Sequence, residues 1–271
     1  MRILSFIPVL MLTLLVSFQS LAEDMKLAVT TSFHNSGLAD ILLPEVKKDL
    51  DLDVYLLIVG TGQALKLGRA GDVDAILVHS RKAEDKFVAE GYGTHRQEIM
   101  YNDFVVIGPK SDEAGVAKSK TAVEAFGAIR DNKAIFVSRG DDSGTNRKEL
   151  DLWKKAGVDP ENFDGSWYRA AGSGMGATLN TAVAMNGYVF SDRASWLNFK
   201  NKGDLELLFS GDPVLFNQYA FIPVNPAIYP HVKNDLAEKL EAWLCGEKVQ
   251  KMIGDYEIAG EQLFTPNAKL N

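Results

Sequence analysis

The chain has 271 residues, of which 46% are hydrophobic and 24% are charged, and these values fit one or two globular domains. They exclude a disordered or fibrous chain. Lys and Arg number 29 against 36 Asp and Glu, which gives a formal net charge of −7. Because an acidic chain is a poor electrostatic partner for nucleic acid or an anionic membrane surface, we expect neither as a partner.

Residues 1–22 have the pattern of a secretory signal peptide. Arg2 supplies a positive charge, and the mostly apolar run 3–16 that follows is too short to span a bilayer. Ser20 and Ala22 are small residues at the positions that signal peptidase reads, which predicts cleavage after Ala22. No later apolar run reaches the length of a membrane span, so we expect an exported protein without membrane insertion.

The first part of the chain alternates short apolar segments with helical patterns. The predicted strands are 26–30, 54–59, 75–78 and 104–107. The predicted helices are 37–48, which Pro44 interrupts, and 63–69. Apolar strands between helices are typical of a sheet covered on both faces, so the pattern predicts an α/β fold.

The second part repeats this alternation. The predicted strands are 134–137, 188–190 and 205–209, and the predicted helices are 143–156, 173–186 and a last one whose apolar stripe is 232, 236, 240 and 243. Two irregular segments, 109–120 and 210–225, divide the chain. We therefore predict two lobes joined by two crossings. Residues 23–108 and 218–271 would form lobe I, with the C-terminal helices returning to it, and 109–217 would form lobe II.

Three predicted strand-to-helix turns are rich in Ser, Thr and Gly. The first is TTSFHNSG at 30–37, the second is VGTGQAL at 59–65, and the third is FVSRGDDSGT at 136–145. A helix N-terminus offers unpaired N–H groups and a partial positive charge, glycine allows close approach, and hydroxyls add donors, so each turn could bind an anion. Arg139 adds a fixed charge and a fork of donors, and Arg169, before a further Gly-rich turn, is a second candidate. The candidate donors are Thr31, Ser32, Thr61, Gly62, Arg139, Ser143, Gly144, Thr145 and Arg169.

Any one of these turns is also what an ordinary capped helix looks like. Three of them in one chain, one with an arginine, favour an anion site. The acidic net charge does not exclude such a site, because neutral donors in a dehydrated cleft act at short range.

A secreted serine hydrolase is the alternative from another class. The segment GDDSG at 140–144 is similar to the GDSGG around a serine-protease nucleophile, but it has an extra Asp, and Thr145 replaces the second Gly. A triad would need a His partner for Ser143, and His34 lies in a turn without protease context. The four histidines lack metal-ligand spacing. We expect a binding protein, not an enzyme, without a cofactor or a protein-ligated metal.

A set of motifs resembles one known family over nearly all of residues 25–265. In chain order they are TTSFHNSGL, VGTGQALKLGRAGDVDAILVHS, EGYG, MYNDFVVIGP, FVSRGDDSGTNRKE, WYRAAGSGMGATLN and SDRASWL. They are similar to the tungstate-binding extracytoplasmic components of ABC transporters. The resemblance implies a two-lobe type II periplasmic binding fold, a periplasmic monomer, and delivery of tungstate, with molybdate as a second candidate ligand, to a permease and its ATPase.

The resemblance also implies the contacts to the oxyanion. Carried over by motif, they are Thr31, Ser32, Thr61, Gly62, Arg139, Ser143, Gly144 and Thr145, with Arg169 as an additional candidate. The first turn departs from the family, because Phe33 and His34 stand where the family often has a third Thr and a smaller polar run. This departure leaves open which hydroxyls of that turn reach the ligand.

Phosphate and sulfate are the alternative ligands within the same fold. The spacing from Arg139 to Thr145 is shared with phosphate-binding proteins, whose site needs a carboxylate acceptor because phosphate keeps a proton near neutral pH. The turn that would supply it reads Val78-His79-Ser80 and has no carboxylate. In the third turn we expect Asp141 to pair with Arg139 and Asp142 to cap the helix. Residue chemistry alone does not rank tungstate above molybdate.

Overall fold

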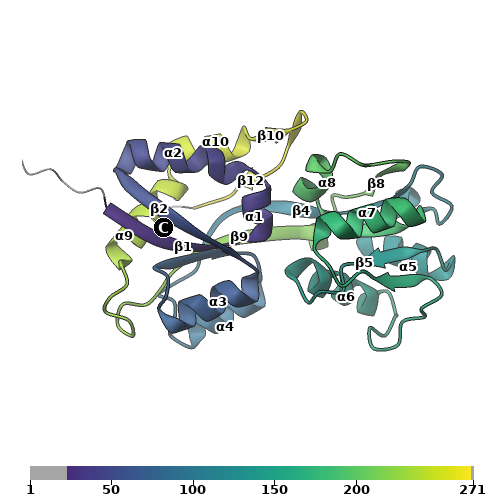
Figure 1. Ribbon diagram of the computed structural model, residues 1–271, viewed down its shortest axis with the longest axis horizontal. Coiled ribbons are helices and arrows are strands. Elements are labelled where there is room, and N and C mark those ends of the chain that lie inside the picture. The colour runs from purple at the N-terminus through teal and green to yellow at the C-terminus, as the bar shows by residue number, and fades with distance from the viewer. Residues whose placement is uncertain (1–22, 270–271) are drawn as a thin grey trace, which may run out of the picture.

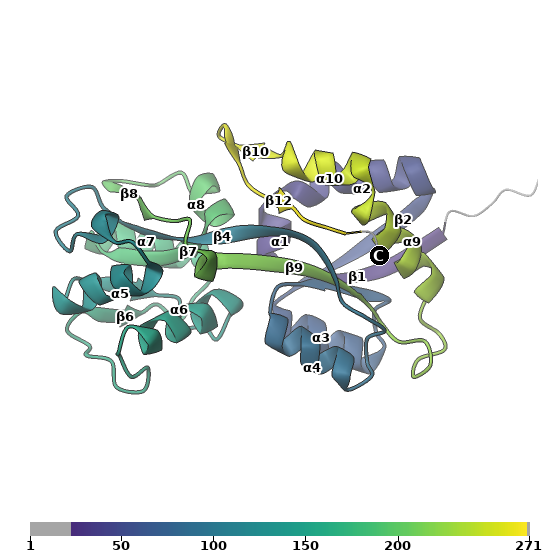
Figure 2. The same ribbon diagram turned by 180° about the vertical axis from the view of Figure 1, so that it is seen from behind.

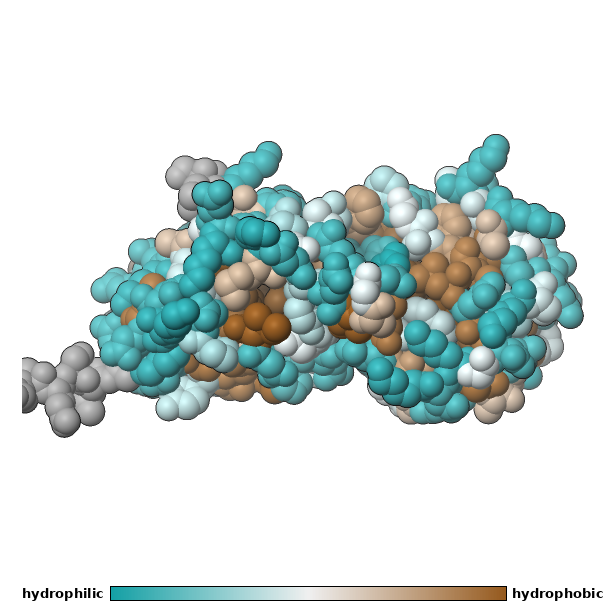
Figure 3. Space-filling view, turned by 90° about the horizontal axis from the view of Figure 1, so that it is seen from above, coloured by the Kyte–Doolittle hydropathy of each residue, from teal (hydrophilic) through white to brown (hydrophobic). Residues whose placement is uncertain are grey.

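The computed structural model describes residues 23–269, so the predicted signal peptide lies outside the described residues. Two α/β lobes lie end to end, and two long strands, β4 (Gln97–Pro109) and β9 (Phe216–Pro223), run from one into the other (Figures 1 and 2). The molecular surface narrows between the lobes, and hydrophilic side chains cover most of the face in Figure 3. Within residues 23–269, the helices are all too short or too polar to cross a membrane.

The first lobe is built on three parallel strands. Strand β1 (Glu23–Thr30) lies between β2 (Leu52–Val59) and β3 (Ala75–Val78), and β3 pairs antiparallel with β9. Because all three parallel strands point the same way, the turns that follow them share one edge of the sheet. The helices of this lobe are α1 (Thr31–Asn35), α2 (Leu38–Leu50), α3 (Thr61–Ala70), α4 (Arg81–Ala89), α9 (Asn234–Cys245) and α10 (Glu247–Gly254).

The predicted interruption at Pro44 is wrong, because α2 continues from Leu38 to Leu50. Proline removes one backbone hydrogen bond, which is a local cost. On either side of Pro44, Leu42 and Val46 are buried in the core and hold the helix on the sheet. Tertiary packing therefore outweighs the local preference.

The second lobe has its own parallel strands. Strand β5 (Phe136–Ser138) lies between β6 (Tyr168–Ala170) and β7 (Tyr188–Asp192), and β4 pairs antiparallel with β7 and with β8 (Leu205–Phe209). Its helices are α5 (Ala122–Asp131), α6 (Gly144–Lys155), α7 (Met175–Met185) and α8 (Arg193–Asn198), with short 3₁₀ turns at Val116–Lys118 and Pro213–Leu215. In the C-terminal segment, β10 (Glu257–Ile258) and β11 (Glu261–Gln262) pair with each other, and β12 (Thr265–Pro266) pairs with the first half of β4 on the side of the first lobe.

The crossing between the lobes takes place within β4 and β9. The first half of β4, up to Asp103, pairs with β9, whereas the second half, from Phe104, pairs with β7 and β8. The irregular segment predicted at 210–225 is wrong over β9, where Tyr219, Ala220 and Phe221 are fully buried. Pro223 misled the prediction because it stands at the very end of the strand, where proline is tolerated.

Each lobe has an apolar core. In the second lobe Phe126, Phe136 and Trp153 stack edge to face, with ring centroids of Trp153 at 4.6 and 5.0 Å from the two phenyl rings. In the first lobe Leu240 and Leu244 of α9 belong to the core formed around Leu27, so this C-terminal helix packs on the first lobe.

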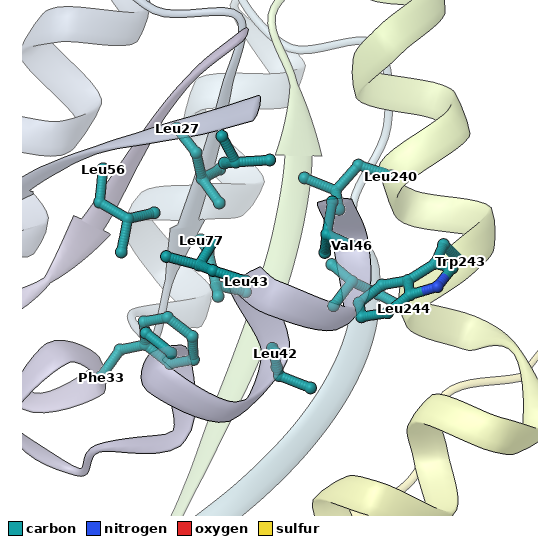
Figure 4. A pocket seen from close by; sticks show the side chains of 12 residues that line it. Leu27, Phe33, Leu42, Leu43, Val46, Leu56, Leu77, Leu240, Trp243 and Leu244 are labelled. Carbon is teal, nitrogen blue, oxygen red and sulfur yellow. The ribbon is translucent and has the colours of Figure 1, made fainter. Parts of the chain in front are cut away.

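A small pocket opens in the first lobe between α2, the sheet and α9 (Figure 4). Leu27, Phe33, Val46, Leu77 and Leu240 are among its lining residues, all of which are apolar. Such a lining offers no donors to an anion, so this pocket is a packing feature of the lobe and not the site that the sequence predicts.

Candidate functional site

Helix N-termini of the two lobes face each other where the lobes meet. In the first lobe α1 and α3 follow the carboxyl ends of β1 and β2, and in the second lobe α6 follows β5 (Figure 1). A Cβ atom added at Gly144, the first residue of α6, would lie 3.3 Å from Cε1 of His79, which follows β3. The turns at the carboxyl ends of both parallel sheets therefore meet across the junction, which is where open α/β sheets bind ligands.

The first turn places Ser32 inside a hydrogen-bonded cluster. Thr30 caps α1 and accepts a hydrogen bond from Phe33 N at 3.2 Å. The Ser32 hydroxyl lies 3.0 Å from Thr30 Oγ1, 2.9 Å from Nε2 of His79 and 3.1 Å from the Tyr219 hydroxyl. Thr31 is exposed at the start of α1. Of the two candidate donors in this turn, Thr31 and Ser32, it is Ser32 whose hydroxyl is held by hydrogen bonds.

The second turn leaves the start of α3 open to a ligand. Gly60 precedes the helix and has no side chain that could cap it. Thr61 is buried, and Gly62 is exposed with no atom within 4 Å of where a Cβ would stand. The first N–H groups of a helix need partners, and a bound anion is a suitable one because it also matches the helix dipole.

The third turn contains an ordered pair of charges. The Arg139 guanidinium donates to Oδ2 of Asp141 from Nε at 3.1 Å and from Nη2 at 2.6 Å, which confirms the predicted pairing. Ser143 caps α6 by accepting from Asn146 N at 3.2 Å. The predicted cap by Asp142 is wrong, because its carboxylate pairs with Arg147 on the helix surface. A serine can take the cap because its β-region backbone aims the hydroxyl at the third N–H of the helix.

The remaining two residues of this turn lie at the start of α6. Gly144 and Thr145 are the first two residues of the helix, and Thr145 is buried. The absence of a side chain at Gly144 keeps the helix end close to His79 of the other lobe. The close approach of the two lobes therefore favours a glycine at position 144, whether or not its N–H also contacts a ligand.

A fourth helix N-terminus joins the site, and the candidate residues from the sequence did not include it. Gly174 precedes α7 and has no capping side chain. Its turn packs on the third turn through hydrogen bonds from Ala171 N to Ser138 O at 2.9 Å and from Ser173 N to Arg139 O at 3.1 Å. The sequence signal for this N-terminus is the Gly-rich run SGMG, which follows Arg169 and precedes a predicted helix.

Arg169 points to the other end of its strand. Its Nη2 donates to the carbonyl oxygen of Ser166, before the start of β6, at 3.2 Å. The turns that surround Arg139 lie after the carboxyl ends of β5 and β6. In this conformation the structure brings eight of the nine candidates to the junction side and leaves the guanidinium of Arg169 hydrogen-bonded elsewhere.

The electrostatics of the junction suit a ligand that only accepts hydrogen bonds. Burial raises the pKa of Asp141, but hydrogen bonds from Ser143 and Arg139 outweigh it, so the net pKa is lowered and the carboxylate stays paired with Arg139. Desolvation lowers the pKa of His79 to about 4, which keeps this ring neutral near neutral pH. Burial also raises the pKa of Asp192, which accepts from Ser195 N at 2.9 Å.

The arrangement does not pair Ser143 with a histidine. The hydroxyl of Ser143 accepts from Asn146 N, and the imidazole of His79 is bonded to Ser32. Over residues 23–269, Ser143 has no hydrogen bond to a histidine. The same described part of the chain holds no cluster of three His, Cys, Asp or Glu side chains suited to a metal ion.

Two α/β lobes joined by two strands, with helix N-termini facing across the junction, define a two-lobe binding protein. A family model described as "PBP superfamily domain" matches residues 19–248, and the chain belongs to this superfamily. Over 246 residues it is 45% identical to a tungstate-binding protein TupA of Peptoclostridium acidaminophilum, with 89% of this chain and 85% of that protein covered.

Two solved structures are similar over most of the chain. One is the tungstate binding protein TupA from Desulfovibrio alaskensis G20, with 46% identity, a TM-score of 0.85, and coverage of 92% of this chain and 100% of that one. The other is described as the tungstate ABC transporter from Geobacter sulfurreducens, with 52% identity, a TM-score of 0.77, and coverage of 86% and 99%. These similarities confirm the predicted two-lobe periplasmic binding fold.

Proposed function

We propose that this protein is an extracytoplasmic receptor that binds tungstate between its lobes and delivers it to an ABC transporter. The observation that carries the proposal is the meeting of helix N-termini from both lobes beside Arg139. The relatives named for tungstate binding, at 45% and 46% identity, supply the identity of the anion. A binding role of this kind requires no catalysis, no cofactor and no protein-ligated metal.

The ligand contacts that we propose are donors. They are the hydroxyls, N–H groups and guanidinium groups of Thr31, Ser32, Thr61, Gly62, Arg139, Ser143, Gly144, Thr145 and Arg169. A tetrahedral dianion without a proton offers only acceptors, and charge-assisted hydrogen bonds to such an anion are the strong ones. Because the donors come from both lobes, the ligand would favour the closed arrangement by its differential affinity.

Molybdate is the second candidate ligand, because it has the same charge and nearly the same size. Phosphate is less well matched, since it needs an acceptor for its proton. Glu84, on the helix that follows the turn after β3, already accepts from Ser80 N and, at 2.7 Å, from Nε of Arg96. Asp141 is engaged with Arg139.

The proposal includes the route and the partners. Residues 1–22 would direct export to the periplasm and be removed there, and the mature monomer would dock on a membrane permease driven by an ATPase. We assign 23–108 and 218–271 to lobe I and 109–217 to lobe II. The passage of β4 and β9 between the lobes supports two lobes joined by two crossings, because the chain crosses the junction once in each strand. The first crossing lies between Asp103 and Phe104, a few residues before the proposed boundary.

Thermal unfolding with added oxyanions tests the function. A ligand present at about 100 times its dissociation constant adds roughly 2.7 kcal/mol of stability. We expect tungstate and molybdate to raise the midpoint of unfolding at micromolar concentrations, and sulfate and phosphate to leave it unchanged. Equal shifts for all four anions, or no shift for tungstate, would show that the assignment is wrong.

A further inference from the structure

The Ser32 hydroxyl has three hydrogen-bonding neighbours and only one hydrogen to give. Thr30 Oγ1, His79 Nε2 and the Tyr219 hydroxyl surround it at 3.0, 2.9 and 3.1 Å. A hydroxyl donates once and accepts twice. If Ser32 gives its hydrogen to a ligand, it can only accept hydrogen bonds from these neighbours, and from at most two of them. The orientation of the cluster therefore decides whether Ser32 is a donor to the ligand.

The other members of the cluster are fixed by their surroundings. Tyr219 lies on β9 with no solvent exposure, and its hydroxyl reaches Ser32 from the crossing strand. Thr30 Oγ1 already accepts from Phe33 N as the cap of α1. Thr30 reaches Ser32 from the same turn and Tyr219 reaches it from the crossing strand, and His79 is the third neighbour.

Hydrogen bonds, an ion pair and ring packing hold the turn that carries His79 in place. Its next residue, Ser80, donates its N–H to the carboxylate of Glu84, whose side chain is fully buried. Glu84 is paired with Nε of Arg96 at 2.7 Å. The imidazole itself packs on the Tyr219 ring with centroids 4.8 Å apart. These contacts fix the direction in which Nε2 points.

His79 also touches the opposite lobe. Its Cε1 lies 3.3 Å and its Nδ1 3.7 Å from the position that a Cβ on Gly144 would take. One edge of the ring thus holds Ser32 within the first lobe, and the other edge faces the start of α6. The ring stands between a candidate donor of one lobe and a candidate helix N-terminus of the other.

We propose that His79 is a positioning residue of the oxyanion site, which donates its Nε2–H to Ser32 and so leaves the Ser32 hydrogen for the ligand. The inference rests on the proposed function and goes beyond the contacts assigned above. The opposite tautomer, with the hydrogen on Nδ1, would take the Ser32 hydrogen for itself. The two tautomers make different predictions for substitutions at His79.

Calorimetric titration of four variants with tungstate tests this role. In His79→Gln the side-chain amide can supply a donor near the position of Nε2, whereas His79→Ala supplies none. We expect His79→Ala to bind about tenfold more weakly, a loss that corresponds to one hydrogen bond. We expect His79→Gln to restore most of that affinity. Ser32→Ala should weaken binding at least as much, and the double variant Ser32→Ala/His79→Ala no more than Ser32→Ala alone, because His79 acts through Ser32.

The matched control is His95→Gln. This histidine bonds Glu241 on the surface of the first lobe at 2.7 Å, away from the cluster, so its replacement should leave tungstate affinity unchanged. Thermal unfolding of each ligand-free variant separates lost positioning from lost folding. ¹⁵N NMR of the imidazole should show the Nε2–H tautomer in the free and bound protein.

Three results would overturn the role of His79: unchanged affinity in His79→Ala, additive losses in the double variant, or an Nδ1–H tautomer. Failure of the wild-type protein to bind tungstate is a separate result. That result would contradict the proposed function itself, whereas the three results above contradict only the role of His79 in a wild-type protein that binds tungstate.

Discussion

Arg139 donates from both Nε and Nη2 to one carboxylate oxygen of Asp141, at 3.1 and 2.6 Å, within a single strand-to-helix turn. The other oxygen of Asp141 accepts from Ser143 N at 3.2 Å, so the carboxylate ties the arginine to the start of α6. The guanidinium retains donors on its remaining nitrogen for a ligand. The ion pair therefore holds the arginine side chain in place for a ligand, and the pair as a whole carries little net charge.

Arg139→Ala should remove most of the stabilisation that tungstate gives. The substitution deletes the fixed cation of the site and its charge-assisted donors. The free protein should stay folded, because the ion pair is local to the turn and its loss leaves the core of the lobe intact. Thermal unfolding with and without tungstate measures both effects. A tungstate shift equal to that of the wild type would refute the role of Arg139.

Asp141→Ala should weaken tungstate binding by about tenfold, although it removes a negative charge from the site. Loss of the carboxylate frees the arginine side chain and costs the entropy of ordering it again on binding. The tungstate affinity of Asp141→Asn should lie between those of the wild type and Asp141→Ala, because the amide oxygen can still accept from Ser143 N. Titration calorimetry of both variants with tungstate measures these affinities. Tighter binding by Asp141→Ala would mean that repulsion outweighs positioning.

Gly144→Ala should weaken binding with little effect on the stability of the free protein. The new Cβ would stand 3.3 Å from His79 Cε1, a contact that requires a shift of a few tenths of an ångström. His79 is held by Ser32, so the easier response is for the lobes to stay apart. Gly165→Ala is the matched control, because its Cβ meets no atom within 4 Å. Small-angle scattering with tungstate should show incomplete closure only for Gly144→Ala.

Glu149 should make the stability of the second lobe depend on pH. Its burial raises its pKa from 4.5 to about 7, despite hydrogen bonds from Ser138, Tyr168 and Trp153. Because the folded state prefers the protonated acid, this contribution is present below pH 4.5 and is lost as the pH rises through 7. The loss is on the order of 3 kcal/mol, at about 1.4 kcal/mol per pKa unit.

Glu149→Gln should flatten this part of the profile, because the amide cannot ionise. Urea unfolding at intervals between pH 4.5 and 8 measures it, with Glu161→Gln on an exposed surface as the control. Identical pH profiles for Glu149→Gln and the wild type would contradict the assignment.

Most strands of both lobes could be predicted because they are apolar runs between helices. The short parallel strand β6 could not, because its residues Tyr168–Ala170 include an arginine and form no apolar run. β3 and β8 have the predicted bounds, and β1, β2, β5 and β7 differ from them by a few residues. β9 was not predictable by the same signal, since Asn217 and Gln218 break its apolar run. Their amides bond Asn102 Oδ1 and Met100 O across to β4, so side-chain hydrogen bonds compensate for polarity inside the sheet.

The turns of the candidate site could be predicted from local composition, since Gly, Ser and Thr at a helix start have direct backbone consequences. His79 and Tyr219 could not, because their roles depend on contacts between β3, β9 and the first turn that are distant in sequence. Asp142 was assigned wrongly because either of two adjacent polar residues could cap the helix. The left-handed backbone of Asp142, with φ of 56°, excludes it from the cap geometry and leaves the cap to Ser143.

Calorimetric titration of the mature protein with tungstate, molybdate, sulfate and phosphate in one buffer tests the proposed function most directly. We predict one site per chain, tight binding of tungstate and molybdate, and binding of sulfate and phosphate that is weaker by a factor of at least 100. The factor corresponds to about 2.7 kcal/mol of discrimination. Phosphate or sulfate binding as tight as that of tungstate, or the lack of any tungstate binding, would contradict the assignment.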